Sequence, residues 1–270
     1  MIDLTGIALK LLRADAHREE LKSLIDAFFD SNPYEFYSQF DRQASAWLIR
    51  VKVLEEPPPM LGIIVGDIVH NIRSALDHLA CQFVLHSGNQ PTTRTAFPLF
   101  DEKPKPGSKP EKRWKDITAG MNAEALEYID HFQPYQTAGK PEPHLLSMLN
   151  TLWNWDKHHD IHVVGHAFDG LDIKGTASTH FAYVETPAFT GLRDGADVGR
   201  FLIDGNKPGG RLHFEIAGGF SMAFENPEKP IINGLEITRL LETISAYISL
   251  DMLMGLANNF PTIDYRPSKR

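Results

Sequence analysis

The chain has 270 residues, a formal net charge of -8 and 42% hydrophobic residues. This length and composition fit one large globular domain or two small ones and exclude an intrinsically disordered chain. The acidic balance excludes a surface that binds nucleic acid everywhere, although a local basic patch remains compatible with it.

The compartment follows from the cysteine count and the N-terminal segment. Cys81 is the only cysteine, so no intrachain disulfide forms, and the early charged residues leave no room for a signal peptide's apolar core. No apolar run approaches the roughly 20 residues that cross a bilayer. We therefore expect a cytoplasmic protein without a membrane span, with Cys81 as a small core residue.

The first predicted elements are a helix and a β-hairpin. Residues 7–29 carry apolar side chains at helical spacing, and Asn32-Pro33 is expected to end that helix. Residues 34–54 then contain two runs in which apolar and polar side chains alternate. The polar break Asp41-Arg42-Gln43 lies between the runs, and the whole pattern predicts a β-hairpin.

The most informative pattern is a second helix over 60–87, whose two faces differ sharply. Its apolar face collects Ile68, Ile72, Ala75, Leu76, Leu79 and Phe83. Its polar face collects Asp67, His70, Asn71, Ser74, Asp77, His78 and Cys81. A solvated helix face normally carries Lys, Glu, Gln and Arg, whereas short polar groups and imidazoles suit a hydrogen-bonded site. The sequence therefore predicts a functional site here, without naming its ligand.

Residues 88–120 contain five prolines and little periodicity, so we expect a long, mobile loop. Within this loop, residues 102–115 hold six Lys or Arg residues against two Glu, and Trp114 lies among them. Two interpretations stay open. The segment is either a solvated loop or a lid that contacts an anionic ligand.

The remaining elements complete an α+β pattern. A short helix is expected over 122–132, strands and turns over 161–225, and a last helix opened by a capping box at Asn233 and Glu236. We expect one α+β domain, with an antiparallel sheet formed by the N-terminal hairpin and a strand-rich C-terminal half. Its helical bundle core comprises four main helices, over 7–29, 60–87, 144–159 and 234–258.

The helix over 144–159 carries a second polar flank. If its apolar side shares a core with the helix over 60–87, the two polar rims are expected to meet in one cleft. In that cleft His70, Asn71, Asp77 and His78 are expected to meet Asn154, Lys157 and His158. The supporting polar cluster comprises Asp67, His70, Asn71, Ser74, Asp77, Asn154, Asp156, Lys157 and His158.

Two resemblances bear on this cluster. The run from Gly66 to Leu79, with Phe97-Pro98 and Asp156-Lys157-His158 further on, resembles a widespread group of bacterial proteins without an assigned activity. The spacing Arg73-x-x-x-x-His78 is similar to the signature of the HEPN superfamily. Members of that superfamily are mostly helical bundles, and many are dimeric, metal-independent ribonucleases, while others only bind nucleotides.

The HEPN resemblance implies catalytic roles for Arg73 and His78. Arg73 would stabilise charge on a phosphate, and His78 would act as general acid and base in RNA cleavage by the 2′-hydroxyl. Ser74 departs from the Asn, Asp or His that often follows that arginine, and the strand-rich half is not part of the HEPN bundle. Residues five positions apart lie about 140° apart around a helix, so the pair is expected to meet across a homodimer axis.

Three functions stay open. The preferred one is a HEPN-like ribonuclease or a nucleotide- or RNA-binding protein that needs no metal or cofactor. The second is a non-catalytic structural or binding protein in which Arg73 pairs with Asp77 and the polar face forms a core or dimer contact. The third is a metal-dependent hydrolase, although the spacings match no standard zinc pattern. Its candidate ligands are His70, Asp77, His78, Asp156, His158, His159, His162 and His166.

Overall fold

The structure is a computed structural model that describes residues 2–43, 46–137, 143–176, 181–185, 191–203, 213–259 and 263–264. It contains helices and small, mostly antiparallel sheets, so the expected α+β class is confirmed. The chain divides into two compact units. The helical unit comprises Met1–Glu20, Ile63–Ile161 and Thr238–Arg270, and the strand unit comprises Leu21–Gly62 and His162–Ile237. Because each unit is built from separate segments, the expectation of a single domain stays a prediction.

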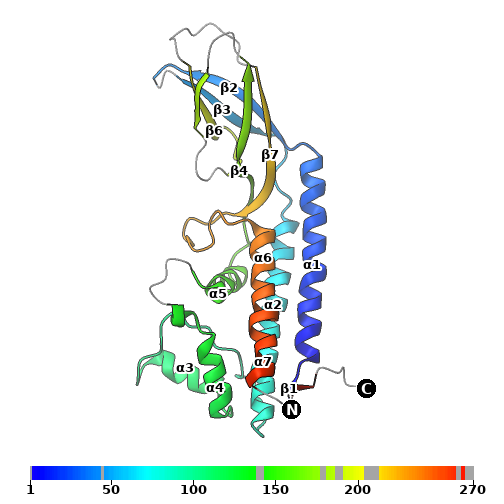
Figure 1. The fold of residues 1–270 in the computed structure, drawn as a ribbon, viewed down its shortest axis with the longest axis vertical. Helices are drawn as coiled ribbons and strands as arrows, with labels where there is room; N and C mark the ends of the chain where they lie inside the picture. Colours follow the sequence, from blue (N-terminus) through cyan, green and yellow to red (C-terminus); the bar gives the residue numbers. More distant parts are fainter. Residues whose placement is uncertain are drawn as a thin grey trace. The chain divides into compact units, whose positions relative to one another are not determined.

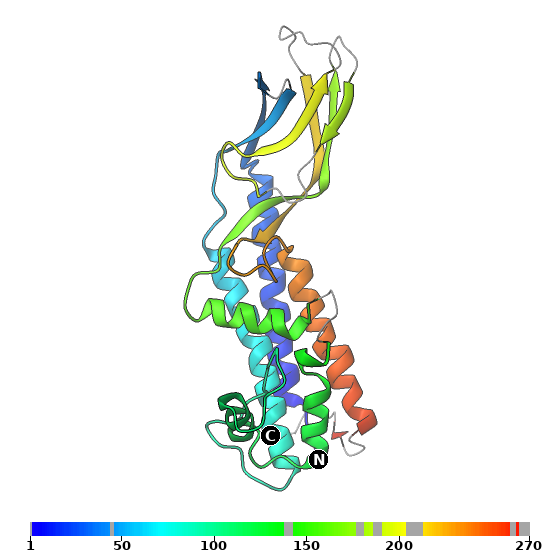
Figure 2. The same cartoon turned by 90° about the vertical axis from the view of Figure 1, so that its left-hand side faces the viewer.

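Three long helical segments run side by side in the helical unit (Figures 1 and 2). They belong to α1 (Thr5–Asp30), α2 (Met60–His86) and α6 (Ile237–Ala246). The chain continues α6 as a π-helical segment, Tyr247–Leu253, and as α7 (Met254–Asn259). The predicted apolar face of α2 is confirmed, because each of its six side chains is at most 1% exposed. That the four main helices form one bundle stays a prediction.

The helical unit also contains shorter helices. They are α3 (Lys109–Ile117), α4 (Ala123–His131) and α5 (Leu145–Asp156), with a 3-10 turn at Pro134–Thr137 after α4. Figure 2 shows α5 lying across α2. The sequence did not predict β1 (Ile2–Asp3) and β8 (Ile263–Asp264), which pair in parallel.

The expectation of a continuous loop over 88–120 is wrong, because α3 lies within it. Ser108 caps this helix by accepting a hydrogen bond from the Glu111 N–H at 3.2 Å, and the Glu111 carboxylate accepts one from the Gly107 N–H at 2.7 Å. Ser and Glu three positions apart are the signature of a capping box. The density of prolines concealed this signal, although Pro110 occupies the first turn, where proline is tolerated.

The expected capping box at Asn233 and Glu236 is also wrong. The Asn233 side chain accepts a hydrogen bond from the Asn226 N–H at 2.9 Å and so closes a turn. Glu236 forms an isolated β-bridge with Ala223, and the helix begins only at Ile237. A side chain with a backbone donor nearby in space does not need to cap the helix that follows it in sequence.

The strand unit contains the predicted hairpin, in which β2 (Tyr34–Asp41) pairs with β3 (Ala46–Val53). The hairpin belongs to an antiparallel sheet of order β2-β3-β6-β5, completed by β6 (Asp197–Ile203) and β5 (Phe181–Glu185). A separate antiparallel pair joins β4 (Val163–Thr176) to β7 (His213–Phe224). A core of Ile49, Val51, Leu192 and Val198 supports this unit.

Within the part of the chain that the structure describes, every helix is too short or too polar to cross a membrane.

Candidate functional site

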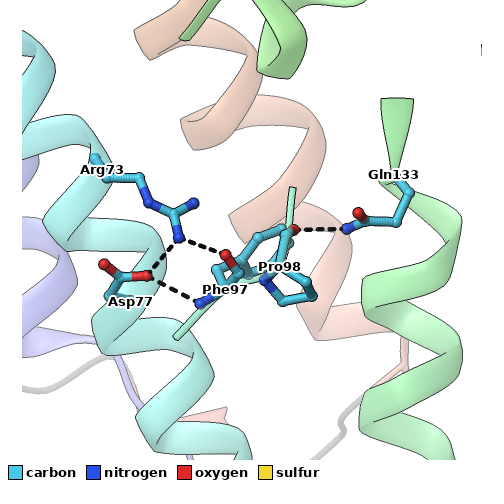
Figure 3. A network of polar contacts seen from close by, with 5 residues as sticks. All are labelled: Arg73, Asp77, Phe97, Pro98 and Gln133. Atoms are coloured by element: carbon cyan, nitrogen blue, oxygen red, sulfur yellow. Dashed lines mark hydrogen bonds and ion pairs between the residues drawn. The ribbon is translucent and has the colours of Figure 1, made fainter. Parts of the chain in front are cut away.

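Arg73 and Asp77 of α2 hold the backbone of Phe97 by hydrogen bonds (Figure 3). Asp77 Oδ1 accepts hydrogen bonds from Arg73 Nη2 and from the Phe97 N–H, both at 2.9 Å. Arg73 Nη2 also donates to the Phe97 carbonyl oxygen. One ion pair between residues four positions apart on α2 therefore satisfies both backbone groups of Phe97.

Gln133 holds the residues that follow Phe97. Its side chain is fully buried, and its Nε2 donates to the Pro98 carbonyl at 2.9 Å and to the Ile129 carbonyl at 3.1 Å. Its Oε1 accepts a hydrogen bond from the Phe100 N–H at 3.2 Å. Figure 3 shows Gln133 approaching Pro98 from the side opposite to α2. Residues 97–100, here termed the Phe97 segment, are thus fixed by side chains from two elements.

One terminal nitrogen of Arg73 takes no part in the contacts with Asp77 and Phe97. The residue is only 9% exposed, and burial lowers the pKa of its guanidinium, which Asp77 partly counteracts. Arg73 Nη1 is buried and has no hydrogen-bond partner among the described residues. Figure 3 shows this nitrogen pointing away from Asp77. Burying a guanidinium with one terminal nitrogen left without a hydrogen-bond partner costs free energy, unless a nearby negative charge compensates the positive charge.

Two exposed cations lie close to Arg73. The pKa of Lys157 is lowered, first by loss of hydration and then by the positive charges of Arg73 and Arg113, while Asp77 acts in the opposite direction. Arg113 likewise lowers the pKa of Arg73. We term Arg73, Arg113 and Lys157 the cation cluster. Of the charged groups that act on Lys157, two are cations and one, Asp77, is a carboxylate.

Aromatic rings support the exposed members of the cation cluster. Lys157 Nζ lies 4.0 Å from the centroid of the Trp153 ring. The Arg113 guanidinium lies 5.9 Å from the centroid of Phe100, the last residue of the Phe97 segment. Such contacts hold a cation over a ring face while its other side stays in solvent.

Helices α2 and α5 contact each other at their crossing, and the cleft expected between their polar rims stays a prediction. His70 packs against Trp153 with 5.3 Å between ring centroids. The pKa of Asp156 is raised, mainly by burial and then by the charge of Asp67, while His70 lowers it. A Cβ atom on Gly66 would lie 2.1 Å from Asp156 Oδ1, so glycine permits this close approach.

We predict that Gly66→Ala destabilises the protein by about 1–3 kcal/mol, although Gly→Ala in a helix normally stabilises by about 1 kcal/mol. The physical reason is the overlap with the Asp156 carboxylate. Urea unfolding followed by circular dichroism measures the effect. The double variant Gly66→Ala/Asp156→Ala should recover most of the loss.

The matched control is Gly255→Ala. Gly255 also lies in a helix, but a Cβ atom there meets nothing within 4 Å. This substitution should be neutral or stabilising. Equal effects at Gly66 and Gly255 would contradict the close approach of α2 and α5.

Other predicted site residues lie away from the cation cluster. His78 is exposed and lies beside α1, since a Cβ atom on Gly6 would be 2.9 Å from His78 Nδ1. Asn71 is buried and donates to the Asp67 carbonyl on its own helix at 2.8 Å. Within one chain, Arg73 and His78 therefore serve different contacts.

The remaining predicted residues are Ser74, which is half-buried, and Asn154 and His158, which are exposed. The prediction that Cys81 is a core residue is wrong, because it is half-buried on the polar side of α2. Burial and the charge of Asp77 raise the pKa of its thiol. The helical period alone placed Cys81 beside Asp77, but it did not give the depth at which Cys81 is buried.

No group of three or more His, Cys, Asp or Glu side chains that could hold a metal ion occurs among the described residues. The candidate ligands are also divided between units, since His162 and His166 belong to the strand unit. Burial lowers the pKa of His166.

Comparisons of the chain with protein-family models, with curated proteins and with solved structures find no match. The site is therefore interpreted from its own geometry, and both resemblances stay predictions. Sequence reasoning missed Gln133, Trp153 and the specific role of Arg113. Only Arg113 carried a signal, as part of the basic segment for which contact with an anionic ligand was one of two open interpretations.

Proposed function

We propose that the protein binds RNA through the cation cluster, as a bacterial, cytoplasmic protein. The observation that supports this most strongly is the local surplus of positive charge at exposed Lys157, on which two cations, Arg73 and Arg113, and one carboxylate, Asp77, act in an otherwise acidic chain. Phosphate groups are the part of RNA that such a surplus recognises, because they carry a charge at every nucleotide.

The three cations have different roles in this proposal. Lys157 and Arg113 are exposed and contact phosphate oxygens directly. Arg73 is buried, so its charge acts through space from beneath them. Since the Phe97 segment is hydrogen-bonded to Arg73 and its Phe100 ring supports Arg113, it fixes the spacing between these two charges.

A chain of phosphates fits this surface better than a single phosphate. Helix α3 exposes Lys109, Lys112 and Lys115 in addition to Arg113. Lys115 is partly neutralised by Glu111 at 2.7 Å. Exposed cations spaced along a helix suit the phosphate backbone of a nucleic acid, which carries a negative charge at each nucleotide.

The test is the affinity for a labelled single-stranded RNA as a function of salt. Lys157→Ala and Arg113→Ala should each weaken binding by about 5- to 10-fold, because each removes a charged hydrogen bond. Each should also reduce the slope of log affinity against log salt by about 0.7, the value for one lost phosphate contact on a single strand.

Lys22→Ala is the charge-matched control, because Lys22 is exposed and belongs to the strand unit. It should leave affinity and slope unchanged. Equal losses in all three variants, or none in any, would rule out the cation cluster as the RNA site.

RNA cleavage by Arg73 and His78 is the further step that the HEPN resemblance implies. Because these side chains serve different contacts within one chain, cleavage requires the proposed homodimer. Gel analysis of the same mixtures in EDTA separates the two possibilities. Cleaved RNA would support a metal-independent ribonuclease, and intact RNA would support a binding protein.

A further inference from the structure

A cavity of about 450 Å³ lies next to the cation cluster, between α3 and the segment from α4 to the 3-10 turn. Its lining includes Trp114 and Lys115 of α3, Glu127 and Asp130 of α4, and Tyr135 beyond them. Cavities of this size are typical of small-ligand sites.

The Phe100 ring connects the cation cluster with the lining of the cavity. The Phe100 ring lies 5.9 Å from the Trp114 ring, and the guanidinium of Arg113 lies 5.9 Å from the same Phe100 ring. Arg113 and Trp114 are neighbours on α3 and therefore point about 100° apart. A ligand whose phosphate contacts Arg113 is therefore one residue along α3 from the cavity lining.

The lining suits a neutral aromatic molecule better than an anion. Its two ammonium groups are each near a carboxylate, Lys115 at 2.7 Å from Glu111 and Lys103 at 3.7 Å from Asp130. Glu127 adds a third carboxylate. The cavity therefore has no positive surplus, whereas the half-buried rings of Trp114 and Tyr135 offer surfaces for stacking.

The carboxylates of the cavity also differ in the hydrogen bonds that they already accept. Asp130 already accepts hydrogen bonds from the Tyr135 hydroxyl and from Gln136 Nε2, the latter at 2.7 Å. Glu127 is exposed and lines the same cavity. A carboxylate accepts hydrogen bonds from the exocyclic amino group of a base, as in the pairing of Glu or Asp with cytosine N4.

We propose that this cavity receives one unpaired, amino-bearing base of the RNA, stacked on Trp114 and hydrogen-bonded to Glu127. The proposal rests on the proposed RNA binding and assigns its base contact. Uracil has no exocyclic amino group, so cytosine or adenine is preferred over uracil.

The test compares short oligo(C), oligo(U) and inorganic polyphosphate, which lacks bases. Trp114→Leu should weaken oligo(C) binding by about 5- to 100-fold, the range expected for one lost stacking contact. It should leave polyphosphate binding unchanged, which also shows that the variant is folded. Lys157→Ala should weaken binding of all three ligands.

Glu127→Gln provides a second variant that preserves the shape of the cavity. It should reduce the preference for oligo(C) over oligo(U) at least about fivefold, because the amide oxygen accepts a weaker hydrogen bond from cytosine N4 than the carboxylate does, and the amide NH2 donates one to uracil O4. Unchanged oligo(C) affinity in Trp114→Leu, or an unchanged preference in Glu127→Gln, would overturn the base site while RNA binding persists. A native protein that binds none of the three ligands would instead overturn the proposed function.

Discussion

Asp77→Ala is expected to lower the free energy of unfolding by about 3 kcal/mol. The substitution removes the only carboxylate that the buried guanidinium of Arg73 contacts among the described residues, and it also removes the acceptor for the Phe97 N–H. Losing one partner of a buried ion pair is costly because the other charge stays desolvated. We place the effect at the lower end of the usual range because the Asp77 side chain is 34% exposed.

Urea unfolding of Asp67→Ala serves as the comparison for Asp77→Ala. Asp67 is also an aspartate of α2, but its carboxylate is exposed and raises the pKa of Asp156 by repulsion. Its removal should change stability by less than about 0.5 kcal/mol. If the two variants unfold at the same urea concentration, Asp77 does not carry the contact with Arg73 and Phe97 in solution.

Gln133→Leu should cost about 3 kcal/mol, for a different reason. Leucine fills a similar volume, but it leaves the Phe100 N–H and the Pro98 carbonyl without the partner that Gln133 provides. Gln133 is fully buried, so water does not replace these hydrogen bonds without opening the packing. The midpoint and slope of urea unfolding measure this loss.

The comparison for Gln133→Leu is Gln136→Leu. Gln136 is exposed, and among the described residues its Nε2 donates only to Asp130, at its carbonyl and its carboxylate. We expect a change below about 1 kcal/mol. A loss at Gln136 as large as that at Gln133 would contradict the special role of the Phe97 segment.

Combining Asp77→Ala with Gln133→Leu tests whether both residues hold the same segment. Residues that share a partner segment show coupled effects, so the double variant should lose less stability than the sum of the single variants. An additive result would show that Arg73-Asp77 and Gln133 act on separate parts of the chain. The coupling also bears on function, because the Phe97 segment carries the ring that supports Arg113.

Elements whose burial follows a local period were predictable from the amino-acid order alone. The apolar face of α2, the hairpin of β2 and β3, and the helix α5 repeat at the spacing of their own backbone. Where a competing signal was present, as with the prolines around Ser108 and Glu111, the same reasoning missed a helix that the local chemistry encoded.

Part of the candidate site was also predictable. The pairing of Arg73 with Asp77 follows from their spacing of four residues. The depth of Cys81 and the separate contact of His78 did not follow. Periodicity gives the direction of a side chain around its own helix, but not which element packs against it.

The groups that Arg73 and Asp77 contact, and the charges that lie near them, depend on how distant segments pack together. The partner of this pair is a backbone peptide at Phe97, and a main-chain group looks the same at every position of a sequence. The approach of Arg113 and Lys157 to Arg73 likewise depends on how α3 and α5 pack against α2. Long-range electrostatic contacts arise from that packing and leave no period in the chain.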